Sequence, residues 1–136
     1  MLNLSANGDY GLLLLKELSL AQPGQYLSLA TLARTKHLPR KYLDHVARQL
    51  VTAGVISARE GRGGGYILSK PVNQIKFVEV LKALEGELEP VHCTHDGKCC
   101  DRKFACERKT GWQEVHAQLY KLLQNKTLAD VIKTAA

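Results

Sequence analysis

The sequence predicts a mainly α-helical domain that carries one small β-hairpin, followed by a further long helix. Three observations lead to this fold class. Apolar residues recur at helical spacing along much of the 136-residue chain, a glycine-rich stretch at 61–65 lies between two β-prone arms, and an apolar seam runs through residues 112–122. Hydrophobic residues make up 45% and charged residues 24% of the chain, which is the composition of an ordinary soluble globular protein.

Neither a membrane span nor an export signal is predicted. The longest apolar run, residues 12–15, is far too short to cross a bilayer, and the first residues lack a basic segment and a cleavage pattern. We therefore expect a cytoplasmic protein with no membrane partner. The net charge of +6 permits nucleic-acid binding but does not establish it, so the position of the basic residues matters.

The first half of the chain predicts three helices. Residues 5–21 form the first, with Ser5 or Asn7 as its N-cap. A short second helix follows over 28–36, and a third begins at Pro39, the residue that best tolerates a helix start. Two short helices joined by a tight turn are typical of a helix-turn-helix.

The third helix has one apolar and one polar face. Leu43, Val46, Ala47 and Leu50 form the apolar stripe. The other face carries Arg40, Lys41, Tyr42, Asp44, His45, Arg48 and Gln49. Basic and amide groups on the second helix of a helix-turn-helix indicate a DNA-reading surface. A solvated basic face on an ordinary helical pair is the alternative.

The segment 55–68 favours the DNA-reading interpretation. It predicts a β-hairpin around a glycine-rich turn, with arginines at 59 and 62, and a hairpin in this place is the wing of a winged helix-turn-helix. A phosphate-binding loop is rejected, because no Lys-Ser/Thr pair opening a helix follows the glycines. The complete set of predicted DNA-contacting residues is Ser28, Arg40, Lys41, Tyr42, Asp44, His45, Arg48, Arg59, Arg62 and Gly64.

The second half of the chain predicts a fourth helix over 74–85, a cysteine-rich segment, a long helix and a short last helix over 128–133. In the long helix Trp112, Val115, Leu119 and Leu122 are spaced 3, 4 and 3 residues apart, which is the narrow seam of a helix that packs along a partner helix. We expect this seam to form a homodimer; packing against its own domain is the alternative. Three parts are thus predicted: a DNA-binding region 1–86, a cysteine-rich loop 87–108 and a dimerisation region 109–136.

All four cysteines lie between residues 92 and 106, at positions 93, 99, 100 and 106. In the cytosol such thiols are metal ligands or redox groups more often than disulfides. No pair has the spacing of two to four residues that structural zinc prefers. The wider spacing favours an iron–sulfur cluster and leaves zinc as the alternative.

The order of these parts resembles the Rrf family of bacterial winged-helix transcription regulators, in particular its IscR- and NsrR-like members. The resemblance covers nearly the whole chain. Its most specific pieces are Leu4-Ser5 with Asp9-Tyr10, Tyr42-Leu43, the wing from Gly61 to Tyr66, and the cysteine loop followed by Trp112. It implies a homodimer whose recognition helices enter successive major grooves of a double-stranded DNA operator. It also implies a 4Fe-4S or 2Fe-2S cluster bound through three cysteines.

The resemblance implies Cys93, Cys100 and Cys106 as cluster ligands, because family loops keep five residues before the last cysteine. Cys99 is the alternative to Cys100, or a spare thiol. The histidine that IscR-like loops carry three residues later is replaced here by Lys109.

For the fourth ligand, the resemblance to NsrR-like proteins implies Asp9 of the partner subunit. Asp9 as an ordinary carboxylate at a helix N-terminus is the alternative, and His92, His95 and Cys99 are nearer candidate ligands.

The resemblance also bears on one position in the third helix and one in the wing. Asp44 matches an acidic position that helps to select bases, and an acid there can accept from a cytosine amino group. A solvated helix charge is the alternative. Where the family often has an arginine before the wing glycine, this chain has Glu60, so minor-groove insertion is not assigned to one residue.

We interpret the chain as a DNA-binding transcription regulator, acting as a repressor, whose DNA binding is controlled by an iron–sulfur cluster that senses redox state, nitric oxide or iron–sulfur status. A regulator of the same fold that binds zinc or senses redox through bare thiols is the alternative. An iron–sulfur oxidoreductase is a distant third, since no Cys-x-x-Cys or nucleotide fingerprint is present. The chain is therefore not expected to be an enzyme.

Overall fold

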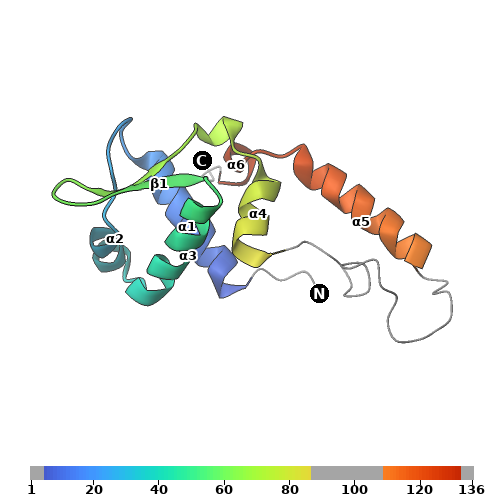
Figure 1. Ribbon diagram of the computed structural model, residues 1–136, viewed down its shortest axis with the longest axis horizontal. Helices are drawn as coiled ribbons and strands as arrows, with labels where there is room; N and C mark the ends of the chain where they lie inside the picture. The colour runs from blue at the N-terminus through green and yellow to red at the C-terminus, as the bar shows by residue number, and fades with distance from the viewer. Residues whose placement is uncertain (1–4, 87–108, 133–136) are drawn as a thin grey trace.

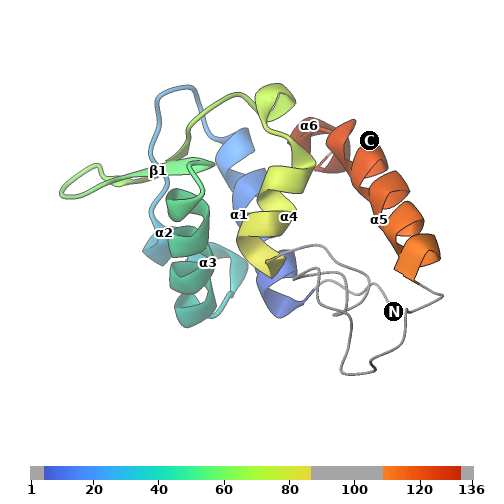
Figure 2. The ribbon, with the colours of Figure 1, turned by 45° about the vertical axis from the view of Figure 1, so that its right-hand side comes forward.

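The computed structural model describes residues 5–86 and 109–132, and it confirms a mainly helical fold with a two-stranded hairpin (Figure 1). In chain order the elements are α1 (Ala6–Leu20), α2 (Leu29–Lys36), α3 (Arg40–Thr52), β1 (Ile56–Arg59), β2 (Gly65–Leu68), the 3₁₀ turn η1 (Val72–Gln74), α4 (Phe77–Glu85), α5 (Lys109–Gln124) and α6 (Leu128–Val131). Helices α1, α3 and α4 pack against one another, with the hairpin at one end and α5 at the other (Figures 1 and 2).

The first helix starts at a capping serine. The Ser5 hydroxyl oxygen accepts a hydrogen bond from the backbone N–H of Gly8 at 3.3 Å, so Ser5 rather than Asn7 is the N-cap. A side chain at Gly11 would overlap the side chain of Leu84, so glycine lets α1 approach α4 closely. The start of α1 is thereby held against α4.

A tight turn leads from α2 to α3. His37 ends α2 in the left-handed conformation, with φ at 54°, and Pro39 follows in an extended conformation. The sequence had predicted Pro39 as the first helical residue of α3. In the structure Pro39 is the N-cap, and the helix begins at Arg40. The apolar stripe of α3 is buried as predicted, and it consists of Leu43, Val46, Ala47 and Leu50.

The hairpin is fixed to the segment ahead of α2. Strands β1 and β2 pair antiparallel, with Arg59 opposite Gly65. Leu27 extends this pairing, because its N–H donates to the Tyr66 carbonyl and its own carbonyl accepts from the Tyr66 N–H, both at 2.9 Å. Gly65 has φ 142°, and a side chain there would overlap the Leu27 carbonyl.

The fourth helix begins later than predicted. Residues 72–74 form a 3₁₀ turn and Ile75 is extended, so α4 starts at Phe77. The returning end of the chain accounts for this: the N–H of Leu128 donates to the Ile75 carbonyl at 2.8 Å, and the N–H of Phe77 donates to the Lys126 carbonyl at 3.0 Å. Ile75 is buried as part of this bridge rather than as part of a helix face.

The core lies between α1, α2, α3, α4 and the base of the hairpin, and α6 closes it. Leu128 of α6 is fully buried there. A capping box starts this last helix: the Thr127 N–H donates to the Asp130 carboxylate at 2.9 Å. The three-part division of the chain stays a proposal, with α6 adding its leucine to the core of the first part.

Candidate nucleic-acid interface

The outer face of α3 presents most of the predicted DNA-contacting side chains. Leu43, Val46 and Leu50 are buried, so the opposite side of the helix is the side offered to a partner. That side exposes Arg40, Lys41, Tyr42, His45 and Arg48, with Asp44 half exposed among them. Four of these six can carry a positive charge, which suits a phosphate backbone.

Asp44 is engaged by its own helix. The Arg40 Nε donates to the Asp44 Oδ1 at 3.1 Å, and both side chains are substantially exposed. An exposed pair of this kind stabilises a helix by only about 0.3–0.5 kcal/mol. A base that offers Asp44 a better donor can therefore replace Arg40 at little cost.

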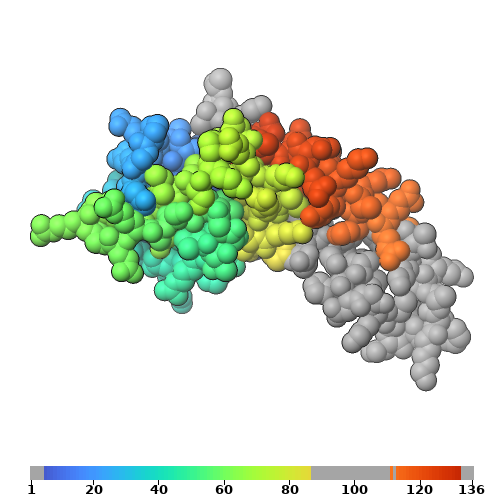
Figure 3. All heavy atoms as spheres, turned by 45° about the horizontal axis from the view of Figure 1, so that its top comes forward, coloured from blue at the N-terminus to red at the C-terminus, as the bar shows by residue number. Residues whose placement is uncertain are grey.

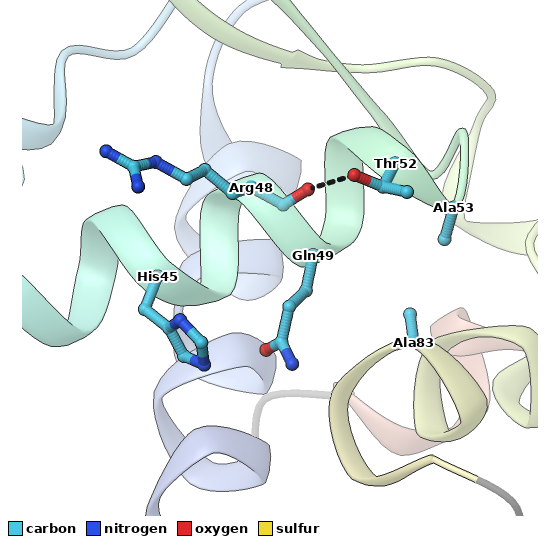
Figure 4. A pocket seen from close by; sticks show the side chains of 6 residues that line it. All are labelled: His45, Arg48, Gln49, Thr52, Ala53 and Ala83. Atoms are coloured by element: carbon cyan, nitrogen blue, oxygen red, sulfur yellow. Dashed lines mark hydrogen bonds between the residues drawn. The ribbon is translucent and has the colours of Figure 1, made fainter.

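Gln49 departs from the exposed position that the sequence had predicted. Its amide oxygen is buried and has no hydrogen-bond partner within residues 5–86 and 109–132. The side chain points into a shallow hollow of about 360 Å³ between α3 and α4, together with His45 (Figure 4). Position 49 lies three residues after the buried Val46 and thus next to it on the helix surface, which draws Gln49 toward the buried stripe.

The two wing arginines have different surroundings. The Arg59 guanidinium lies over the ring of Tyr26, 5.7 Å from its centroid. Arg62 is exposed in a turn between two glycines of positive φ, where the Gly64 N–H donates to the Gly61 carbonyl at 3.1 Å. Within the described part of the chain Arg62 has no ion pair or ring contact.

The hairpin tip projects beyond the rest of the surface (Figure 3). Gly64 closes this tip, because a side chain there would overlap the Arg59 carbonyl. Ser28 is the N-cap of α2, but its side chain makes no capping hydrogen bond. Ser28 thus keeps a hydroxyl next to the wing, since Leu27 pairs with β2.

A contact that sequence reasoning missed joins α1 to the recognition surface. The rings of Tyr10 and Tyr42 stack with centroids 5.4 Å apart and planes 16° from parallel. The two residues are far apart in sequence and no motif links them, so the stack follows from the packing of α1 on α3.

The predicted cluster ligands are described only in part. Cys93, Cys99, Cys100 and Cys106 lie outside the described residues, and within residues 5–86 and 109–132 no three metal-ligating side chains gather. Asp9 is described: it lies exposed in the first turn of α1. No hydrogen bond or ion pair to its carboxylate occurs among the described residues.

The predicted dimerisation seam is largely uncovered by the described parts of the chain. Val115 is 50% and Leu122 60% exposed, while Leu119 is half-buried. Helix α5 touches α4 through Tyr120 instead, whose hydroxyl oxygen accepts from the Lys82 Nζ at 3.0 Å. The side chain of Trp112, the first residue of the predicted seam, lies outside the described part of the structure.

A helix-turn-helix, a wing and a basic recognition face are the parts of a winged-helix DNA-binding protein. Residues 4–134 of the chain match the family model Rrf2, described as iron-dependent transcriptional regulator. The chain belongs to the Rrf2 family. As a member, it is a transcription regulator and not an enzyme, and DNA is its partner. None of the described helices is both long and apolar enough to span a membrane.

This Rrf2-family regulator is similar to individual relatives over nearly its whole length. It is 31% identical over 135 residues to Protein rrf2 of Nitratidesulfovibrio vulgaris, covering 99% of this chain and 90% of that one. It is 30% identical over 139 residues to the regulator IscR of Cereibacter sphaeroides, covering 97% and 88%. The structure of CymR, the global cysteine regulator of Bacillus subtilis, matches with a TM-score of 0.73 at 27% identity, over 97% of both chains.

Proposed function

We propose that this Rrf2-family regulator is a repressor whose DNA binding is controlled by an iron–sulfur cluster. The cluster ligands are Cys93, Cys100 and Cys106, with Asp9 of the partner subunit as the fourth and Cys99 as the alternative to Cys100. The DNA contacts come from Ser28, Arg40, Lys41, Tyr42, Asp44, His45, Arg48, Arg59, Arg62 and Gly64. The family's description as iron-dependent agrees with this proposal.

The observation that carries the proposal is the position of Asp9. Its carboxylate is exposed at the start of α1 and has no partner among the described residues. At the same end of α1, the Ser5 N–H and hydroxyl both donate to the Glu85 Oε1, at 2.9 and 2.7 Å. Glu85 is the last residue of α4, which precedes the cysteine segment in the sequence, so the end of α4 lies beside the helix end that carries Asp9. That the partner subunit supplies Asp9 is what the resemblance to NsrR-like proteins implies.

The donor set suits iron. Thiolates are the usual ligands of iron–sulfur clusters, and a set of three leaves one position for a different ligand. A carboxylate is a harder and weaker ligand than a thiolate for this metal. When bound, the cluster would supply a redox- and nitric-oxide-sensitive bond between the two subunits, and Asp9 is the chain's weakest ligand in it.

A homodimer is required by this arrangement, and the exposed seam of α5 supports one. Val115 and Leu122 are apolar, exposed and four and three residues from Leu119, so they can pack against the same seam of a second copy. A two-fold dimer also presents two copies of α3 and of the wing to successive grooves of DNA.

The chain's own residues then connect the two sites. Asp9 is held or released at the start of α1, and α1 packs directly on α3. A shift of α1 changes the position of α3, and hence the spacing of the two recognition helices on DNA. DNA binding would follow from whether Asp9 is held.

The test is anaerobic reconstitution of wild-type and Asp9→Ala chains with iron and sulfide. The wild type is expected to be brown, with acid-labile sulfide, and to bind DNA differently with and without its cluster. Asp9→Ala is expected to change the Mössbauer spectrum and to lose that difference. Asp9→Ala protein with the wild-type spectrum and the wild-type response would contradict the assignment. Asn7→Ala, two residues away and half-buried in the same helix, is the matched control.

The alternative regulator holds zinc or uses bare thiols. Its support is the likeness to CymR, described as a cysteine regulator, together with the fourth cysteine, which a three-thiolate site leaves over. A colourless protein with stoichiometric zinc would favour the zinc form. A colourless, metal-free protein whose DNA affinity changes on oxidation would favour the thiol form.

A further inference from the structure

We propose that Tyr10 is a positioning residue of the DNA interface, which holds Tyr42 of the recognition helix in the orientation that contacts DNA. The proposal rests on the family's DNA binding and on the packing of α1 against α3. It does not depend on a cluster, on Asp9 or on the nature of the signal.

The two rings have unequal environments. Tyr10 is partly buried and packs against the hydrophobic core, whereas Tyr42 is 46% exposed on the outer face of α3. Their rings stack with centroids 5.4 Å apart and planes 16° from parallel, within the range that aromatic pairs prefer. The inner ring therefore has a fixed place, and it sets the side-chain conformation of the outer one.

Tyr42 is placed to use this support. It lies in the first turn of α3 between Lys41 and Leu43, on the side that also exposes Arg40 and His45. Across the described ranges no group hydrogen-bonds to the Tyr42 hydroxyl, which can therefore donate to a phosphate oxygen. Restricting the ring before DNA arrives lowers the entropy that binding would otherwise cost.

The helix segment that carries Tyr10 contacts α4. The neighbouring Gly11 lies so close to Leu84 that a side chain at position 11 would overlap it. Five residues before Tyr10, the N-cap Ser5 hydrogen-bonds to Glu85. Tyr10 is thus carried by a helix end that contacts α4, which gives its ring a defined position against Tyr42.

The test is a double-mutant cycle on DNA affinity, using the full chain. The probe is the duplex most enriched by the wild type from a randomised double-stranded library. Each variant is measured with and without its cluster, so the cycle does not require cluster control. Tyr10→Phe keeps the ring, whereas Tyr10→Leu keeps apolar volume and loses the stack. Tyr42→Ala removes the contact itself.

Tyr10→Phe is expected to bind within twofold of the wild type, and Tyr10→Leu about two- to tenfold more weakly, the range of an aromatic pair. The double variant Tyr10→Leu/Tyr42→Ala is expected to bind no more weakly than Tyr42→Ala, because Tyr10 acts only through Tyr42. Leu12→Ala is the control: it removes a partly buried side chain of α1 that packs on the core, and it should leave DNA affinity unchanged.

Three results would overturn the proposal. These are wild-type affinity in Tyr10→Leu, losses in the double variant that multiply those of the single variants, and equal losses in Tyr10→Leu and Leu12→Ala. Thermal unfolding checks that each variant is folded. If Tyr10→Leu does not fold, Tyr10→Met, whose flexible side chain fills irregular space, takes its place in the cycle. Equal affinity of the wild type with and without its cluster would contradict cluster control alone and leave the cycle to decide on Tyr10.

Discussion

The Arg59 guanidinium lies 5.7 Å from the centroid of the Tyr26 ring, and this contact separates the two arginines of the wing by role. Arg59 is tethered at the end of β1 where the wing turn begins, next to the position at which Leu27 bridges to Tyr66. Arg62 stands in the exposed turn and has no such tether among the described residues. Both arginines belong to the proposed DNA contacts, but the Arg59 cation also stabilises the wing through Tyr26, whereas Arg62 at the tip is available to a DNA groove without leaving a ring contact.

Arg62→Ala is predicted to weaken DNA binding and to reduce the slope of log affinity against log salt by about one, the effect of one lost phosphate contact. Arg59→Ala is predicted to reduce the slope by less than Arg62→Ala, because the Arg59 cation is shared with Tyr26, and to destabilise the wing by about 0.5–1 kcal/mol, because it removes an exposed cation–π contact. Fluorescence anisotropy at several salt concentrations measures the slopes. A larger slope change in Arg59→Ala than in Arg62→Ala would reverse the two roles.

Gly65→Ala is predicted to lower the free energy of unfolding by about 2–4 kcal/mol. The new side chain would meet the Leu27 carbonyl in a backbone conformation that favours glycine, and it would break the two hydrogen bonds between Leu27 and Tyr66. Gly24→Ala is the matched control: its φ is also positive, at 80°, but no atom lies within 4 Å. Gly24→Ala should lower the free energy of unfolding, measured with urea, by only about 1–2 kcal/mol. Equal costs at the two positions would argue against the close approach of Leu27.

Local patterns were enough to predict most of the helices, the hairpin and the recognition face. The stripe from Leu43 to Leu50 and the cap at Ser5 depend on neighbours in sequence, and both lie where predicted. Ile75 was placed wrongly in a helix because its backbone partner is Leu128, which no local pattern reveals. Gln49 was expected to be exposed, but its position beside the buried stripe turns it inward.

Three contacts of the candidate interface join residues that are distant in sequence. Tyr10 of α1 contacts Tyr42 of α3, while Tyr26 and Leu27, between α1 and α2, contact Arg59 and Tyr66 of the hairpin. Composition and periodicity predict which faces are buried, but not which exposed side chains come together. The four cysteines lie outside the described residues, so their iron–sulfur chemistry stays a prediction from the sequence.

Leu122→Glu is predicted to dissociate the homodimer, weakening it by at least about tenfold, because a carboxylate would be buried in an apolar seam. Leu20→Glu is the control. Leu20 is 64% exposed, close to the 60% of Leu122, but it is the last residue of α1 and does not belong to the seam. Size-exclusion chromatography with light scattering gives the mass of each variant. A Leu122→Glu chain that stays dimeric would show that the dimer forms through a surface other than the seam.

Mixed dimers decide which subunit supplies Asp9. One chain carries Asp9→Ala, and its partner lacks the thiols through Cys93→Ala, Cys100→Ala and Cys106→Ala. If Asp9 binds across the dimer, this pair contains one complete site and should give the wild-type spectrum at half the iron content. The reciprocal pair joins a wild-type chain to one carrying all four substitutions. There the wild-type cysteines face a partner without Asp9, so the spectrum should be that of Asp9→Ala. The opposite pattern would place Asp9 and the cysteines of one site on the same chain, where the Ser5–Glu85 contact already brings the start of α1 to the end of α4.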